Sequence, residues 1–97
     1  MANVNIMTTS TTDGAKSGVS VTGRCTLQAS GTFAGANLLI QTSATDGNYG
    51  NARDAKSESL VFKGVGGVNL EIVGTQYVRV VQSGSTATTS VAIIATQ

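Results

Sequence analysis

The chain has 97 residues, 40% of them hydrophobic and 11% charged, and its formal net charge is +1. This length allows one hydrophobic core, and the near-neutral charge provides no field that would concentrate nucleic acid or an anionic membrane surface. We therefore expect a single domain over residues 1–97 and no nucleic acid as partner. No apolar stretch approaches the length of a membrane span, and the first residues lack a secretory signal, so we expect synthesis in the cytoplasm and no membrane as partner.

The composition predicts strands. Fourteen Thr and ten Ser supply most of the polar surface, and twelve Gly supply turns. β-Branched residues pack well on a pleated surface, and few good helix formers remain. Runs with a period of two residues recur about every ten residues, which is the spacing typical of an antiparallel sandwich or small barrel.

The first strand is predicted over residues 3–9, with Val4 and Ile6 on one face and Met7 on the other. The Thr-rich run that follows is flexible enough for residues 1–12 to serve as an N-terminal arm or as a strand exchanged with a neighbour. In either case Val4 and Ile6 would lie in an interface. The alternative is an ordinary first strand of the same sandwich.

The next elements are two strands and a long loop. A run over residues 19–29 predicts one strand, with a β-bulge expected at Gly23 and Arg24. The segment Leu38-Leu39-Ile40 predicts a further strand, and its three consecutive apolar side chains indicate burial on both faces. The period of two then breaks over residues 45–57, the longest predicted loop.

The C-terminal half continues this pattern. Strands are predicted at residues 59–62 and 68–73, and the glycine-rich segment between them indicates a hairpin. The last strands are predicted over residues 77–81 and 86–96. Seven or eight strands with such short connections must be antiparallel, because parallel neighbours need long crossovers. The predicted fold class is an all-β, antiparallel two-sheet β-sandwich, immunoglobulin-like or jelly-roll-like.

Catalytic equipment is missing from the sequence. There is no histidine, and the five acidic residues are scattered. Asp46, Asn48 and Asp54 offer oxygen ligands of the kind calcium takes, but their spacing is not that of an EF-hand and is typical of turns. Cys25, the only cysteine, is expected to be a small buried side chain. The sequence therefore predicts no enzyme, no cofactor and no metal site.

Interface residues are the remaining candidates. Tyr77 and Arg79 share one face of a strand; if that face points outward, they are residue types enriched at interface hot spots, and if it points inward, Arg79 needs a buried partner. For the first segment, deletion of residues 1–9 is expected to abolish assembly or partner binding and to leave a folded core. The candidate interface residues are Val4, Ile6, Asn48, Tyr49, Arg53, Tyr77 and Arg79.

Several short motifs follow one another between residues 23 and 95. They are Gly31-Thr32-Phe33-Ala34-Gly35-Ala36, Leu38-Leu39-Ile40-Gln41, Asp46-Gly47-Asn48-Tyr49, Leu60-Val61-Phe62, Tyr77-Val78-Arg79-Val80 and Ser83-Gly84. This succession resembles that of small β-sandwich virion proteins of tailed bacteriophages, the capsid decoration or cement proteins.

The resemblance implies a structural virion protein that binds the outer capsid surface and bridges coat subunits. Its partner would be the major capsid protein, and its location the capsid surface of the virion. A homo-oligomer, with a trimer favoured because it matches a capsid threefold axis, suits such a subunit. The alternative function is a receptor- or glycan-binding module of a head fibre or tail, acting through the loop over residues 46–56. An immunoglobulin-like adhesion module is a more distant alternative.

Overall fold

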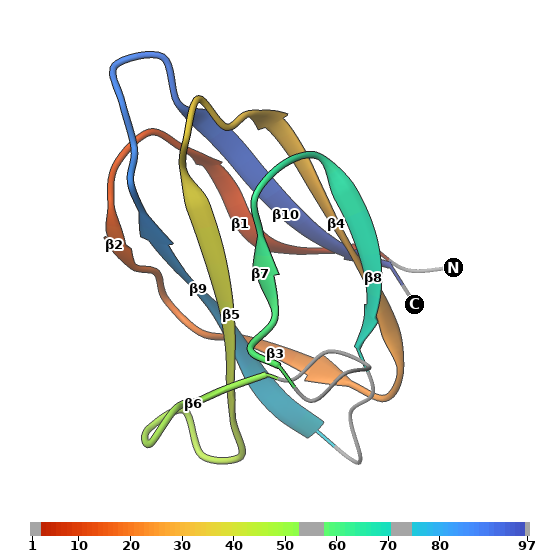
Figure 1. Ribbon diagram of the computed structural model, residues 1–97. Helices are drawn as coiled ribbons and strands as arrows, with labels where there is room; N and C mark the ends of the chain where they lie inside the picture. The colour runs from red at the N-terminus through yellow and green to blue at the C-terminus, as the bar shows by residue number, and fades with distance from the viewer. Residues whose placement is uncertain (1–2, 53–57, 71–74, 97) are drawn as a thin grey trace.

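The computed structural model describes residues 3–52, 58–70 and 75–96, and all its regular elements are β-strands (Figure 1). In chain order the strands are β1 (Asn3–Ser10), β2 (Gly14–Ala15), β3 (Val19–Thr22), β4 (Cys25–Thr32), β5 (Asn37–Ser43), β6 (Gly50–Asn51), β7 (Val61–Phe62), β8 (Gly66–Leu70), β9 (Thr75–Ser83) and β10 (Ser90–Thr96). The described residues include no helix that is long and apolar enough to cross a membrane.

The strands form the two layers of a β-sandwich. Sheet A has the order β1-β10-β4-β8. Sheet B has the order β2-β9-β5-β6; β3 pairs with the same edge of β9 as β2, and β7 with the same edge of β5 as β6. Every ladder is antiparallel, so the predicted fold class is confirmed. The strands outnumber the predicted seven or eight for two reasons: β2 and β6 have two residues each and leave no periodic pattern, and the strand predicted over residues 19–29 is divided into β3 and β4.

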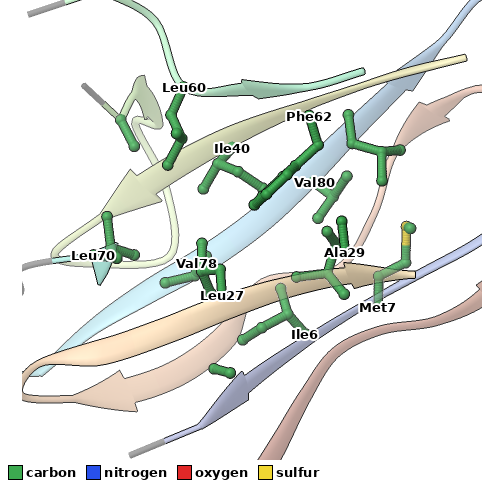
Figure 2. Close-up of a cluster of buried hydrophobic side chains, with 14 of the residues drawn as sticks. Ile6, Met7, Leu27, Ala29, Ile40, Leu60, Phe62, Leu70, Val78 and Val80 are labelled. Carbon is green, nitrogen blue, oxygen red and sulfur yellow. The ribbon is translucent and has the colours of Figure 1, made fainter. Parts of the chain in front are cut away.

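An aliphatic core fills the space between the sheets (Figure 2). Sheet A contributes alternate residues of β4 and β10, namely Cys25, Leu27, Ala29, Val91, Ile93 and Ala95. Sheet B contributes alternate residues of β5 and β9, namely Leu38, Ile40, Val78 and Val80. Since neighbouring side chains on a strand point to opposite faces, the intervening residues lie on the two outer faces of the sandwich.

Cys25 confirms its prediction as a buried structural residue. It is a free cysteine within the core, and burial raises the pKa of its thiol. A thiol that is kept protonated and out of solvent is a poor nucleophile.

The first strand, β1, pairs with β10 of the same chain and is irregular. Its register shifts twice, first between Asn5 and Met7. Because a bulge inserts an extra residue, Ile6 and Met7 both point into the core, and the predicted outward position of Met7 is wrong (Figure 2). Val4 packs against the same core. A strand exchanged between copies would occupy this same site, so exchange of residues 1–12 stays a prediction.

The predicted strand over residues 19–29 is in fact two strands in different sheets. β3 belongs to sheet B and β4 to sheet A, and the chain crosses between them at Gly23 and Arg24. Gly23 has φ of 76°, a left-handed conformation that favours glycine. The expected β-bulge is therefore wrong. Val21 and Cys25 are buried on either side of the crossing and keep the period of two. The sequence pattern therefore does not reveal that the chain changes sheets here.

The predicted hairpin of the two strands around residues 64–67 is also wrong. β7 pairs with β5 in sheet B, whereas β8 pairs with β4 in sheet A. The glycine-rich segment between them carries the chain from one layer to the other (Figure 1). Phe62 and Leu70 then enter the core from opposite sheets. A glycine-rich turn can join two strands of one sheet or connect the two sheets. Here the sheets are connected, because β7 pairs with an edge of β5 and β8 pairs with an edge of β4.

The segment Leu38-Leu39-Ile40 is buried on one face alone. Leu38 and Ile40 are fully buried, whereas Leu39 is half-buried and pairs with Val81 and Val61 on the outer face of sheet B. Burial on both faces would need a third layer over sheet B, and the described part of the chain forms two layers. The predicted two-sided burial is wrong for this reason.

The contrast between Leu38 and Leu39 gives a test of the sandwich. Leu38→Ala leaves a cavity between the sheets and is expected to lower the free energy of unfolding by about 3 kcal/mol. Leu39→Ala is expected to lower it by about 1 kcal/mol or less, because solvent already reaches that side chain. Urea denaturation of both variants measures the difference, and equal losses would contradict the assignment of faces.

Candidate functional site

The outer face of sheet B carries the densest group of the predicted interface residues. In β9, Arg79 lies between Val78 and Val80, which are both fully buried, so its side chain points outward, as one of the two readings expected. Across the ladder, Arg79 is opposite Gln41 in β5. We call this surface the Arg79 face and define it by Ala15, Leu39, Gln41, Tyr49, Val61, Tyr77, Arg79 and Val81.

The Arg79 guanidinium is held in place by two contacts. Its Nε donates a hydrogen bond of 2.8 Å to Oε1 of Gln41. Its Cζ lies 4.1 Å from the centroid of the Tyr49 ring, which is a cation–π geometry. Among the described residues, no carboxylate pairs with this guanidinium, and its two terminal nitrogens have no hydrogen-bond partner. The fork of N–H groups is therefore available to a ligand outside this part of the chain.

Tyr49 is itself fixed by two neighbours. Its hydroxyl donates a hydrogen bond to the carboxylate of Asp46. It also lies against Gly18, where an added Cβ would collide with the phenol oxygen. Burial, followed by the hydrogen bond to Asp46, raises the pKa of Tyr49 to about 12, so the hydroxyl stays protonated and the ring stays uncharged under Arg79.

The loop that presents Tyr49 is anchored at its base. The buried Ser43 hydroxyl accepts hydrogen bonds from the backbone N–H groups of Thr45 and Gly47, each at 3.2 Å. β6 then returns along β5, where Asn51 pairs with Gln41. Part of the predicted loop over residues 45–57 is thus a short strand, which the sequence prediction missed.

A line of amide and hydroxyl groups extends the arginine contact across the sheet. Gln41 accepts from Arg79 through Oε1 and donates through Nε2 to Oδ1 of Asn51 at 3.0 Å. Asn51 donates in turn to Oγ of Ser59 at 3.3 Å. Since both ends of the Gln41 amide are used, the carboxamide cannot rotate without losing a bond, and this keeps the orientation of Arg79.

An apolar row runs beside this polar line. Val61, Leu39, Val81 and Ala15 are paired in succession across β7, β5, β9 and β2. Val61, Leu39 and Val81 are half-buried, and Ala15 is exposed. An apolar row next to a fixed arginine and two tyrosines resembles the composition of protein interfaces more than that of an average protein surface.

The other predicted interface residues are distributed as follows. Tyr77 is half-buried on the same face of β9 as Arg79, and Asn48 is exposed in the loop beside Tyr49. Arg53 lies outside the described residues. Val4 and Ile6 face the core, so an interface role for them requires β1 to leave its place and stays a prediction.

Gln41, Leu39 and Gly18 were missed as members of the site. For Gln41 and Leu39 part of the signal was present, because they occupy alternate positions of one strand, as Arg79 and Val81 do in another. The register that pairs Gln41 with Arg79 and Leu39 with Val81 comes from the structure. For Gly18 there was none, since its role depends on a contact with Tyr49 across the fold. Among the described residues, no group of three or more Asp, Glu, Cys or His could hold a metal ion.

The state of Tyr49 can be measured by alkaline titration. The pKa of Tyr49 in the folded chain, about 12, lies above the ordinary value of 10.0. The Tyr49–Asp46 hydrogen bond therefore stabilises the fold fully below pH 10, and this stabilisation is lost as the pH rises towards 12. Phenolate absorbance is expected to show a component near pH 12. Tyr49→Phe should remove this component and Tyr77→Phe should leave it. A Tyr49 component centred near pH 10 would contradict the described contacts.

Comparison with known proteins finds the same fold in a prophage-derived protein. No protein-family model matches the sequence, and no curated protein sequence matches it. Among solved structures, the crystal structure of the SPBc2 prophage-derived protein YomS is similar, with a TM-score of 0.69 and 12% sequence identity. The alignment covers 97% of this chain and 88% of that one. The chain therefore shares its β-sandwich fold with a prophage-derived protein.

Proposed function

We propose that the chain is a structural protein of a bacteriophage particle that binds the outer capsid surface and bridges coat subunits. The observation that carries the proposal is the fixed Arg79–Tyr49–Gln41 cluster beside an apolar row on the Arg79 face. The shared fold with a prophage-derived protein supports the phage context. The proposed partner is the major capsid protein, and the proposed location is the capsid surface.

The Arg79 cluster is suited to binding a protein surface. Tyrosine and arginine bury large areas and dominate interface hot spots. Because Gln41 and Tyr49 already restrain the guanidinium, little rotamer entropy is lost when a partner arrives. The terminal N–H fork matches a carboxylate, and the adjacent apolar row excludes water around that contact. The proposal thus assigns a carboxylate of the coat protein to Arg79.

Repetition of the coat lattice would strengthen a contact of this size. One face of a 97-residue domain offers a modest area, so a single contact is expected to be weak. A subunit that bridges neighbouring coat subunits combines such contacts, and linked contacts exceed single ones by roughly 10² to 10⁴ in affinity. This is the physical basis on which the subunit would stabilise a mature shell.

Cosedimentation with expanded, undecorated capsids of the encoding phage tests the proposal. The wild-type chain is expected to saturate at hundreds of copies per particle, as repeated coat sites require. Arg79→Ala is expected to weaken binding about 30-fold or more, the loss typical of a hot-spot residue. Arg24→Ala is the matched control, because it removes an exposed arginine that lies beside Thr26 and Asn69 of the opposite sheet, and it is expected to bind normally.

Two further variants separate charge from geometry. Arg79→Lys keeps the charge but loses the planar fork, and is expected to bind less well than the wild type. Gly18→Ala displaces Tyr49 and leaves Arg79 in the sequence, so it tests the restraint on the guanidinium. Thermal unfolding of each variant checks that the fold persists. Saturation at a few copies per particle together with binding to host cells would contradict the proposal and favour a receptor-binding module.

A further inference from the structure

Within the described residues, the strands of sheet A present an outer face without charged side chains. None of the strands β1, β4, β8 and β10 contains a charged residue. Of the charged residues that the structure describes, Arg24 lies at the end of this face, where it lines a hollow with Thr26, Asn69 and Thr96. The others are Asp13, Lys16, Asp46, Glu58, Lys63 and Arg79, and none of them belongs to a strand of sheet A. Solvent-facing sheets ordinarily carry Lys and Glu, which keep the sheets of different molecules apart. This face lacks that protection.

Uncharged polar side chains surround an aliphatic centre on this face. Ile94 in β10 is half-buried and lies between Asn5 in β1 and Gln28 in β4. Gln28 and Asn5 are exposed, and Ala92 is the next outward residue of β10. The central part of the surface is therefore a short apolar strip with an amide on each side.

The part of the face formed by β10, β4 and β8 is regular, whereas β1 is bulged against β10. The ladder of β10 with β4 and the ladder of β4 with β8 run without a register shift. Thr26 donates to Oδ1 of Asn69 across the strands at 2.9 Å, and the Gln28 side chain lies over Gly67, where an added Cβ would come within 3.0 Å of Oε1. Side chains that lie along the sheet leave a low surface that a second flat surface can approach.

These features match a second copy of the same face. Hydroxyl and amide groups both donate and accept, so a set of them complements itself. Two copies would bring no like charges together, and no ion would lose its hydration. A charged partner surface would instead lose hydration and gain no counter-ion. A self-complementary contact of this kind is isologous and has twofold symmetry.

The available area indicates how strong the contact is. Four strands about 4.8 Å apart and about 3.3 Å per residue over the seven residues of β10 give a footprint of about 450 Å² per copy. Two copies would bury about 900 Å², slightly below the range of stable specific interfaces. A contact of this size is expected to give a weak dimer that forms only at high concentration.

We infer that the outer face of sheet A is a self-association surface that pairs two copies of this chain about a twofold axis near Ile94. The pairing is independent of capsid binding, because it uses the layer opposite the Arg79 face. It also differs from the trimer that the resemblance implies, since a trimer needs two different surfaces in each contact.

Sedimentation equilibrium of the full chain, without capsids, tests the inference. From about 1 μM to about 2 mM, the mass is expected to rise from the monomer value of 9.8 kDa towards twice that value. The dissociation constant is expected to stay within about twofold between about 0.05 and 0.5 M salt, because the four strands that form the contact hold no charged residue and Arg24 lies at its edge.

A matched pair of variants locates the contact. Ile94→Lys places two like charges beside the twofold axis and is expected to weaken dimerisation at least tenfold. Leu39→Lys makes the same kind of change at a half-buried aliphatic residue on the Arg79 face and is expected to leave the dimer intact. If Ile94→Lys fails to fold, Gln28→Lys at an exposed position gives the same test.

Three results would overturn the inference: a monomer at every concentration, a dimer that Ile94→Lys and Gln28→Lys do not weaken, or a trimer insensitive to both. Loss of capsid binding by Leu39→Lys with an unchanged dimer would support the separation of the two surfaces. A wild-type chain that dimerises but does not bind capsids would contradict the proposed function and leave this inference standing.

Discussion

The structure depends on the burial of alternate aliphatic side chains of β5 and β9 against sheet A. Leu38, Ile40, Val78 and Val80 are fully buried, and each fixes the direction of its neighbours on the strand. The neighbours of Arg79 and Gln41 on each strand are buried in the core, so both side chains must point outward. They meet there because the two residues are paired across the ladder. A one-residue slip between these strands would bury the arginine and expose valines, so the same hydrophobic energy that closes the sandwich also sets the geometry of the Arg79 face.

The period of two was sufficient to predict the fold class, because the fold class depends on local alternation. It placed Tyr77 and Arg79 on one face but left the direction of that face open, and the burial of Val78 and Val80 decides it. It failed where the chain leaves one sheet for the other. At Gly23 and at the segment over residues 64–67, a turn that crosses the sandwich has the same composition as a bulge or a hairpin. It also failed at Met7, since a bulge changes the count of residues without changing their types. The Tyr49 contact with Gly18 joins distant segments, and no local pattern encodes it.

The two outer faces of the sandwich differ in their chemistry. The Arg79 face combines a restrained cation, two aromatic rings and an apolar row, and the proposed function assigns it to the coat protein. The opposite face has hydroxyl and amide groups around Ile94 and no charged residue within its four strands, and we assign it to a second copy of the chain. The Arg79 face favours a partner with a carboxylate, whereas the outer face of sheet A favours an uncharged partner. The two faces are therefore not expected to compete for the same partner.

The position of β9 inside sheet B has a mechanical consequence. This strand forms ladders with β5 along one edge and with β2 and β3 along the other. A pull on Arg79 directed along the strand would load the hydrogen bonds of both ladders in shear, and they would have to fail together. The same pull on an edge strand would load the hydrogen bonds of one ladder only. In the proposed function, tension from the coat protein would therefore enter the domain through a strand that is hydrogen-bonded along both of its edges.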